Sequence, residues 1–330
     1  MAAMKRIKYL ALSFLCLAAP MLGALDFQIP EVLGISGFGT TLTEQITAEL
    51  PGKSHETSPF YGQTPRSDIM VESASNNIKA PSNGTIIYVQ TEAPVKTIFS
   101  FPLGGALAVR HPESYLSLLS GLDADQALKF SKQDQTTTQD VPAVKKGETL
   151  SGGSGSGVYP PNCFGLRLFD AQSALWVNPV FLASWIQDRT SPVIRGAKLT
   201  KFDDSGTSPF DLSGAAVKEK RIMCVQGSYR IWVDAFDTII PGSSLHSAPY
   251  RILVVLDGKS IIDTSFIAAN CSEGGLSFLG NPAPSRETLA ADGSYNIGQI
   301  MLARGEHDLQ LQVSDYAGNQ SSLKTLIIAY

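Results

Sequence analysis

The stretch that decides the fold is VKKGETLSGGSGSGVYPPNCFGLRLFD, which runs from Val144 to Asp170. Its last eight residues, Cys163 to Asp170, carry the apolar side chains Phe164, Leu166 and Leu168 at every second position. Alternation of this kind predicts a β-strand with one buried face. The segment SGGSGSG, Ser151 to Gly157, has the composition of a flexible linker. The sequence of the strand and the loop alone does not decide whether SGGSGSG is a linker between domains or a turn within one domain.

With Gly147, Gly157, Phe164, Leu166 and Leu168 in register, the stretch resembles the motif of lysostaphin-type (LytM-type) zinc endopeptidases. Two upstream stretches, which lie in residues 68–84 and 104–122, are similar to the other motifs of that family. The resemblance covers residues 62–190 as a domain and implies an antiparallel β-sheet of the duplicated hybrid motif type. It also implies that SGGSGSG is a turn inside this domain, not a linker between domains.

The resemblance assigns five positions to a vestigial site. In chain order they are Thr64, Asp68, Gly121, Cys163 and Gly165. Family members carry histidines at four of these positions, and only the aspartate is retained here. We expect Asp68, Gly121, Cys163 and Gly165 to surround one shallow groove, with Cys163 within about 10 Å of Asp68. Tyr159 and Arg167 are candidate contacts for a molecule bound in that groove.

These residues do not provide a metal site. A catalytic zinc ion needs three protein ligands and an open position for water, and glycine has no donor atom to offer. The chain has four histidines, without a spacing typical of metal ligands: His55, His111, His246 and His307. We therefore predict no catalytic residue, no metal ligand and no cofactor, whereas an active enzyme with unusual ligands would require zinc.

The N-terminus has the features of a signal peptide over residues 1–24. Lys5, Arg6 and Lys8 form a basic region, an apolar run follows, and Leu22-Gly23-Ala24 is a plausible cleavage site. The apolar run is shorter than the roughly 20 residues that span a bilayer, and no later segment looks transmembrane. We expect a secreted, periplasmic or envelope-associated protein, in which residues 25–61 lead into the first domain.

Composition excludes one class of partner. The 330 residues are 43% hydrophobic and 17% charged, and the formal net charge is −4. A chain of this kind buries a sizeable core but presents no basic surface for nucleic acid. Any partner must be recognised by shape and specific contacts.

The C-terminal part, residues 191–330, predicts a β-sandwich. Polar and apolar residues alternate from Gly227 to Ala235, from His307 to Asp315 and from Leu323 to Ala329. Asp257-Gly258 is a strong hairpin signal. The stretch GEHDLQLQVSDYAGN is similar to sequences of extracellular immunoglobulin-like modules, which implies an all-β protein of two domains.

Three cysteines follow the signal-like segment: Cys163, Cys224 and Cys271. In an oxidising compartment, Cys224 and Cys271 could form a disulfide within the sandwich, which would leave Cys163 alone. The alternative is that all three are reduced and buried.

Three functions remain open at this point. The first is a catalytically inactive peptidase homologue that binds peptidoglycan peptide or regulates a cell-wall hydrolase. The second is an active metalloendopeptidase with unusual ligands, and the third is a structural envelope protein.

Overall fold

The computed structural model describes residues 28, 32–36, 67–75, 77–90, 103–123, 142–157, 159–182, 188–202, 208–213, 221–243, 245–272, 275–284, 287–290 and 292–330. Nearly all regular structure in this part of the chain is β-strand, with two short 3-10 turns, η1 (Pro112–Ser114) and η2 (Pro179–Leu182). The prediction of an all-β fold is confirmed. No helix within the described ranges is long and apolar enough to cross a membrane.

The first unit consists of ten strands among the described residues. They are β1 (Val32–Ser36), β2 (Asp68–Ser73), β3 (Ile78–Lys79), β4 (Gly84–Gln90), β5 (Gly105–Arg110), β6 (Tyr115–Leu122), β7 (Ala143–Val144), β8 (Thr149–Ser151), β9 (Cys163–Asp170) and β10 (Leu175–Val177). The predicted strand from Cys163 to Asp170 is thus β9, and it is central, because it pairs antiparallel with β2, β6 and β10. The lead-in contributes β1, which pairs with β2.

Strand alternation gives the sheet of this unit two different faces. Ile69 and Val71 of β2 and Leu166 of β9 point into the main hydrophobic core. The intervening positions, which include Asp68, Met70 and Gly165, lie on the opposite face. The candidate site is therefore on the face of the sheet that turns away from the main core.

The loop SGGSGSG lies inside this unit, as predicted. Gly155 N–H donates to the carbonyl of Cys163 at 3.0 Å, and Ser156 N–H donates to the carbonyl of Gly121 at 3.3 Å. Ser156 Oγ also donates to the carbonyl of Leu122 at 2.7 Å. These bonds fix the loop across the ends of β6 and β9.

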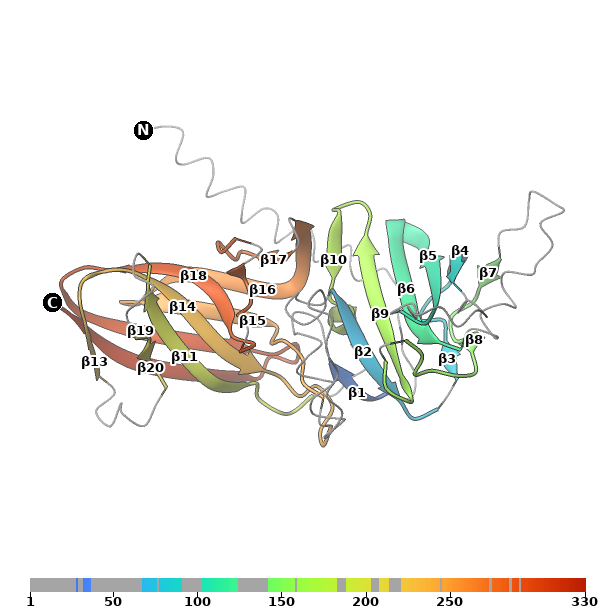
Figure 1. Ribbon diagram of the computed structural model, residues 1–330, viewed down its shortest axis with the longest axis horizontal. Helices are drawn as coiled ribbons and strands as arrows, with labels where there is room; N and C mark the ends of the chain where they lie inside the picture. Colours follow the sequence, from blue (N-terminus) through green and yellow to red (C-terminus); the bar gives the residue numbers. More distant parts are fainter. Residues whose placement is uncertain are drawn as a thin grey trace, which may run out of the picture.

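The second unit consists of the remaining strands. They are β11 (Val193–Lys201), β12 (Phe210–Asp211), β13 (Arg221–Cys224), β14 (Gly227–Phe236), β15 (Arg251–Leu256), β16 (Lys259–Ser272), β17 (Gly275–Leu279), β18 (Tyr295–Leu302), β19 (Gly305–Ser314) and β20 (Gln320–Ala329). One sheet has the order β12-β11-β14-β18, and β13, β20, β19, β15, β16 and β17 lie in the other. The two sheets face each other around a shared core, so this unit is a sandwich (Figure 1). The predicted hairpin at Asp257-Gly258 joins β15 to β16.

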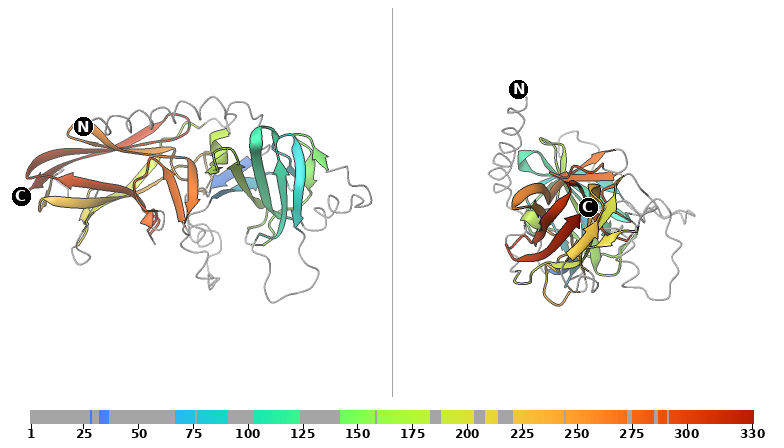
Figure 2. Two further views of the ribbon diagram at one scale, coloured as in Figure 1. Left: turned by 90° about the horizontal axis from the view of Figure 1, so that it is seen from above. Right: turned by 90° about the vertical axis from the view of Figure 1, so that its left-hand side faces the viewer.

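The two units are connected by pairing as well as by the chain. Trp176 and Val177 of β10 pair with Ala269 and Ala268 of β16, which makes one sheet run through both units (Figures 1 and 2). The core of buried side chains also continues from one unit into the other. The junction is thus held by backbone hydrogen bonds together with apolar packing.

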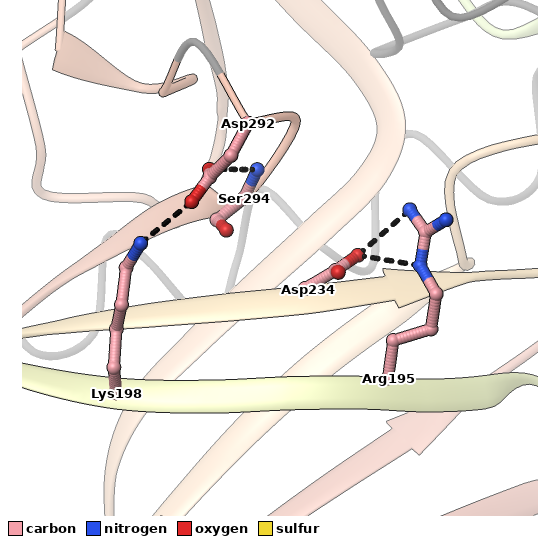
Figure 3. Close-up of polar contacts among 5 residues, drawn as sticks. All are labelled: Arg195, Lys198, Asp234, Asp292 and Ser294. Atoms are coloured by element: carbon pink, nitrogen blue, oxygen red, sulfur yellow. Dashed lines mark hydrogen bonds and ion pairs between the residues drawn. The ribbon is translucent and has the colours of Figure 1, made fainter. Parts of the chain in front are cut away.

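The outer face of the β11–β14 sheet carries ion pairs beside the aromatic rings of Trp232 and Phe236. Figure 3 shows Lys198 Nζ bound to Asp292 Oδ2 at 2.6 Å and the guanidinium of Arg195 bound to Asp234 Oδ1 at 2.9 and 3.0 Å. Burial raises the pKa of Asp292, but hydrogen bonds from Lys198 and Ser294 outweigh it and lower that pKa to about 2. Such partly exposed pairs contribute little to stability, so this face is a solvated one.

Candidate functional site

The candidate site lies where β2, β9 and β6 run side by side. Gly165 of β9 pairs with Met70 of β2 on one side and with Ser120 of β6 on the other. Asp68 pairs with Arg167. Because residues directly opposite each other in an antiparallel pair share a face, Asp68, Ser120 and Arg167 all surround Gly165 on the same side of the sheet.

The centre of this surface is filled by Tyr159. Its hydroxyl donates to Asp68 Oδ2 at 3.0 Å and accepts from Ser120 Oγ at 2.7 Å. Arg167 Nη2 lies 4.0 Å from Asp68 Oδ1. Asp68 is only 2% exposed, so these contacts compensate a carboxylate that is removed from water.

The two glycines leave room for the Tyr159 ring. A Cβ atom on Gly165 would lie 2.1 Å from Tyr159 Oη and 2.5 Å from Ser120 Oγ. A Cβ atom on Gly121 would lie 2.7 Å from Tyr159 Cδ2, and Gly121 also has a φ of +78°. Asp68, Gly121 and Gly165 therefore converge on one place, and that place is occupied by an aromatic side chain.

A residue from the second unit covers the ring. Tyr159 packs with Met70, Cys163 and Leu245 in a small hydrophobic cluster in which every member is buried. Leu245 belongs to the loop that follows β14. Tyr159 is therefore a buried core residue and not the exposed groove contact that the sequence suggested, whereas Arg167 keeps 31% of its side chain exposed.

Cys163 lies farther from Asp68 than we expected. Cys163 pairs with Glu72, four residues along β2 from Asp68, which corresponds to roughly 13 Å of strand. The expectation of about 10 Å is therefore wrong, because the register of β2 on β9 could not be obtained from the sequence. Cys163 borders Tyr159 but not the Asp68 carboxylate, so the motif alignment that placed Cys163 at the same site as Asp68 is wrong.

The surroundings of Asp68 do not fit a zinc ion. Asp68 supplies a carboxylate, but Gly121 and Gly165 supply no donor and their side-chain space is filled by Tyr159. A zinc site needs three or four N, O or S ligands in tetrahedral directions. We therefore derive no reaction step through a metal at this place.

The described histidines have structural roles. His111 is buried and bonds the carbonyl of Asn83 and Ser117 Oγ at 2.8 and 2.7 Å. Burial lowers its pKa. His246 stacks on Phe236. His307 Nδ1 donates a hydrogen bond to Asp257 Oδ2 at 2.8 Å, and this bond raises the pKa of His307. Thr64, His55 and the signal-like segment lie outside the described residues.

The structure contradicts the disulfide between Cys224 and Cys271. None of the three described cysteines, Cys163, Cys224 and Cys271, is part of a disulfide. Cys224 pairs with Ala329 at the last residue of β20, whereas Cys271 lies beyond the opposite end of the sandwich, where β16 pairs with β17. Two residues at opposite ends of the sheet cannot meet the Cα separation of less than about 7 Å that a disulfide requires.

This arrangement predicts the reactivity of the thiols. In the native protein, Cys271 should react with a thiol reagent within minutes because it is exposed. Cys163 and Cys224 are buried and should react more than about 10-fold more slowly. Peptide mapping after timed labelling measures the difference, and a Cys224–Cys271 linked peptide in the unreduced sample would contradict it.

Comparisons with known proteins add little to the geometry. The NMR solution structure of lysostaphin is similar to the chain with a TM-score of 0.27 and 10% identity, over 87% of this chain and 91% of that chain. A family model without a functional description matches residues 205–330. No curated protein matches the chain in sequence.

Proposed function

We propose that the first unit is a peptidase-like domain without peptidase chemistry, which binds peptidoglycan peptide or regulates a cell-wall hydrolase in the bacterial envelope. The observation that carries the proposal is the position of Tyr159, whose ring fills the space between Asp68, Gly121 and Gly165. A site that held an ion and an activated water would need that space.

Arg167 is the residue that we propose to contact the partner. Its guanidinium lies beside the buried Asp68 carboxylate and remains partly exposed. Arginine is well suited to bind a carboxylate through two parallel hydrogen bonds, and peptide chains end in carboxylates. A wall peptide or an acidic loop of a hydrolase is therefore the kind of partner that we propose for this surface.

The proposal also includes a cellular location and a role for the second unit. The basic and apolar N-terminal segment supports export to the periplasm or envelope. We propose that the sandwich is immunoglobulin-like and supports the first unit, because its Leu245 seals the cluster around Tyr159. We do not propose nucleic acid as a partner.

Binding to purified peptidoglycan sacculi tests the proposal. The protein should co-sediment with sacculi, should release no muropeptides and should gain no activity on addition of zinc. Arg167→Gln should weaken binding about 10-fold, which corresponds to the loss of one charge-assisted contact. Arg221→Gln removes a charge from an exposed residue of the second unit and serves as the matched control.

Each alternative function has its own outcome in this experiment. Cleavage that a chelator abolishes and zinc restores would establish an active metalloendopeptidase. No binding to sacculi and no capture of a purified wall hydrolase would favour a structural envelope protein. Equal binding by the Arg167 and Arg221 variants would place the contact elsewhere.

A further inference from the structure

Three aspartates meet at the end of the sandwich that faces the first unit. Asp188 lies in the connection that precedes β11, Asp237 directly follows β14, and Asp315 directly follows β19. One carboxylate oxygen from each lies within 4.8 Å of the others. In the described part of the chain, no other group of three acidic, histidine or cysteine side chains approaches this closely.

The central carboxylate is buried with little compensation. Asp237 is 1% exposed, and neither of its oxygens has a hydrogen-bond partner among the described residues. Asp315 is also 1% exposed, but it accepts hydrogen bonds from the backbone of Ala317 and Asn319. A buried carboxylate without a partner costs several kcal/mol, and two neighbouring negative charges increase that cost.

A second unpartnered group lies beside it. Asp237 and Ser247 exchange both backbone hydrogen bonds at 2.9 Å in an isolated antiparallel bridge. Their side chains therefore leave the same face of the bridge. Ser247 Oγ is buried and, within the described ranges, also has no hydrogen-bond partner, so a second unpartnered oxygen belongs to the residue opposite Asp237.

We propose that Asp188, Asp237 and Asp315 form a calcium site that ties the connection between the units to both sheets of the sandwich. Calcium takes oxygen ligands at about 2.3–2.6 Å, so two ligands of one ion are at most about 5 Å apart. The three carboxylates satisfy this limit without rearrangement. Magnesium demands near-ideal octahedral geometry at shorter distances, for which a cluster drawn from three separate segments is less suited.

The topology explains what the ion does for the protein. Asp237 follows a strand of the four-stranded sheet, and Asp315 follows a strand of the facing sheet. Asn319 holds the third segment, because its Nδ2 donates to Asp315 Oδ2 at 2.7 Å and to the carbonyl of Thr190 at 3.1 Å. An ion at this point stabilises the orientation of the sandwich relative to the connection that leads to the first unit.

Protons compete with the ion. Burial raises the pKa of Asp237 to about 7, the charges of Asp188 and Asp315 add to the shift, and the backbone of Thr238 opposes it. The other titratable group that faces Asp237 is Tyr316, whose pKa is raised by burial.

Thermal unfolding of the purified, chelator-treated full chain tests the site. At pH 8, calcium chloride at about 100-fold its dissociation constant should raise the unfolding midpoint by about 5 °C. Calorimetric titration should give one calcium per chain. Magnesium chloride should give a much smaller shift.

Variants separate a bound ion from general charge screening. Asp237→Asn keeps the shape and removes the buried charge, so without calcium it should unfold at or above the wild-type midpoint, and it should lose the calcium response. Asp315→Asn should lose the response as well. Asp308→Asn changes the net charge equally at an exposed position and should keep the full response.

Two results would overturn the proposal. The first is an unchanged midpoint and no heat of binding in the wild type at millimolar calcium. The second is an equal response in Asp237→Asn, which would mean that the ion does not use this carboxylate cluster. An equal response to magnesium would overturn the assignment of the site to calcium.

Discussion

Replacing Tyr159 with alanine should lower the free energy of unfolding by about 3–5 kcal/mol, which is the usual cost of removing a buried aromatic ring. Tyr159 is 5% exposed and packs with Met70, Cys163 and Leu245. The substitution also removes the hydroxyl that donates to Asp68. Urea unfolding followed by tryptophan fluorescence measures the loss as a lower midpoint.

Two controls divide this loss into its parts. Tyr159→Phe keeps the ring and removes the hydroxyl, so it should cost about 1–3 kcal/mol through the loss of the hydrogen bonds to Asp68 and from Ser120. Tyr88→Ala removes a ring that is 51% exposed, and it should change stability by less than about 0.5 kcal/mol. If Tyr159→Ala were as mild as Tyr88→Ala, the ring would not be part of the core.

The strands could be predicted because their signal is local. Alternation in Cys163–Asp170, Gly227–Ala235 and His307–Asp315 corresponds to β9, β14 and β19. The Asp-Gly pair at residues 257–258 also predicted a hairpin, because these residue types tolerate the positive φ of such a turn. Both residues have a positive φ in the structure. Such features depend on neighbours in the chain and need no knowledge of the tertiary fold.

The contents of the candidate site could not be predicted, because they depend on register and loop path. Motif spacing brought Asp68, Gly121 and Gly165 together, but no pattern indicated that Tyr159 would turn inward between them. The register of β2 on β9 moved Cys163 away from Asp68. The disulfide prediction failed for a similar reason, since strand-like surroundings do not tell at which end of a sandwich a cysteine lies.

The acidic cluster was missed entirely. Asp188, Asp237 and Asp315 come from three segments far apart in the chain, and none follows the spacing of a calcium loop. The one available signal was positional, because Asp237 and Asp315 each directly follow a predicted alternating strand. Only the packing of the two sheets brings those strand ends together.

The second large effect concerns the glycine beneath the ring. Gly165→Ala should cost about 2–3 kcal/mol through overpacking, because the added Cβ would lie 2.1 Å from Tyr159 Oη and 2.4 Å from Tyr159 Cζ. Gly165 has no positive φ, so backbone strain does not contribute. Gly196→Ala is the matched control, since a Cβ there meets only Ser213 Oγ at 3.6 Å, and it should be nearly neutral.

A double-mutant cycle then identifies what the alanine clashes with. In the Tyr159→Ala background, the cost of Gly165→Ala should fall below about 1 kcal/mol, so that the coupling energy is about 2 kcal/mol. The remaining close atom, Ser120 Oγ at 2.5 Å, can rotate away. A cost that is the same in both backgrounds would mean that the ring does not exclude a side chain at Gly165. A strong coupling means instead that a larger side chain does not fit at Gly165 while the Tyr159 ring occupies the space beside it.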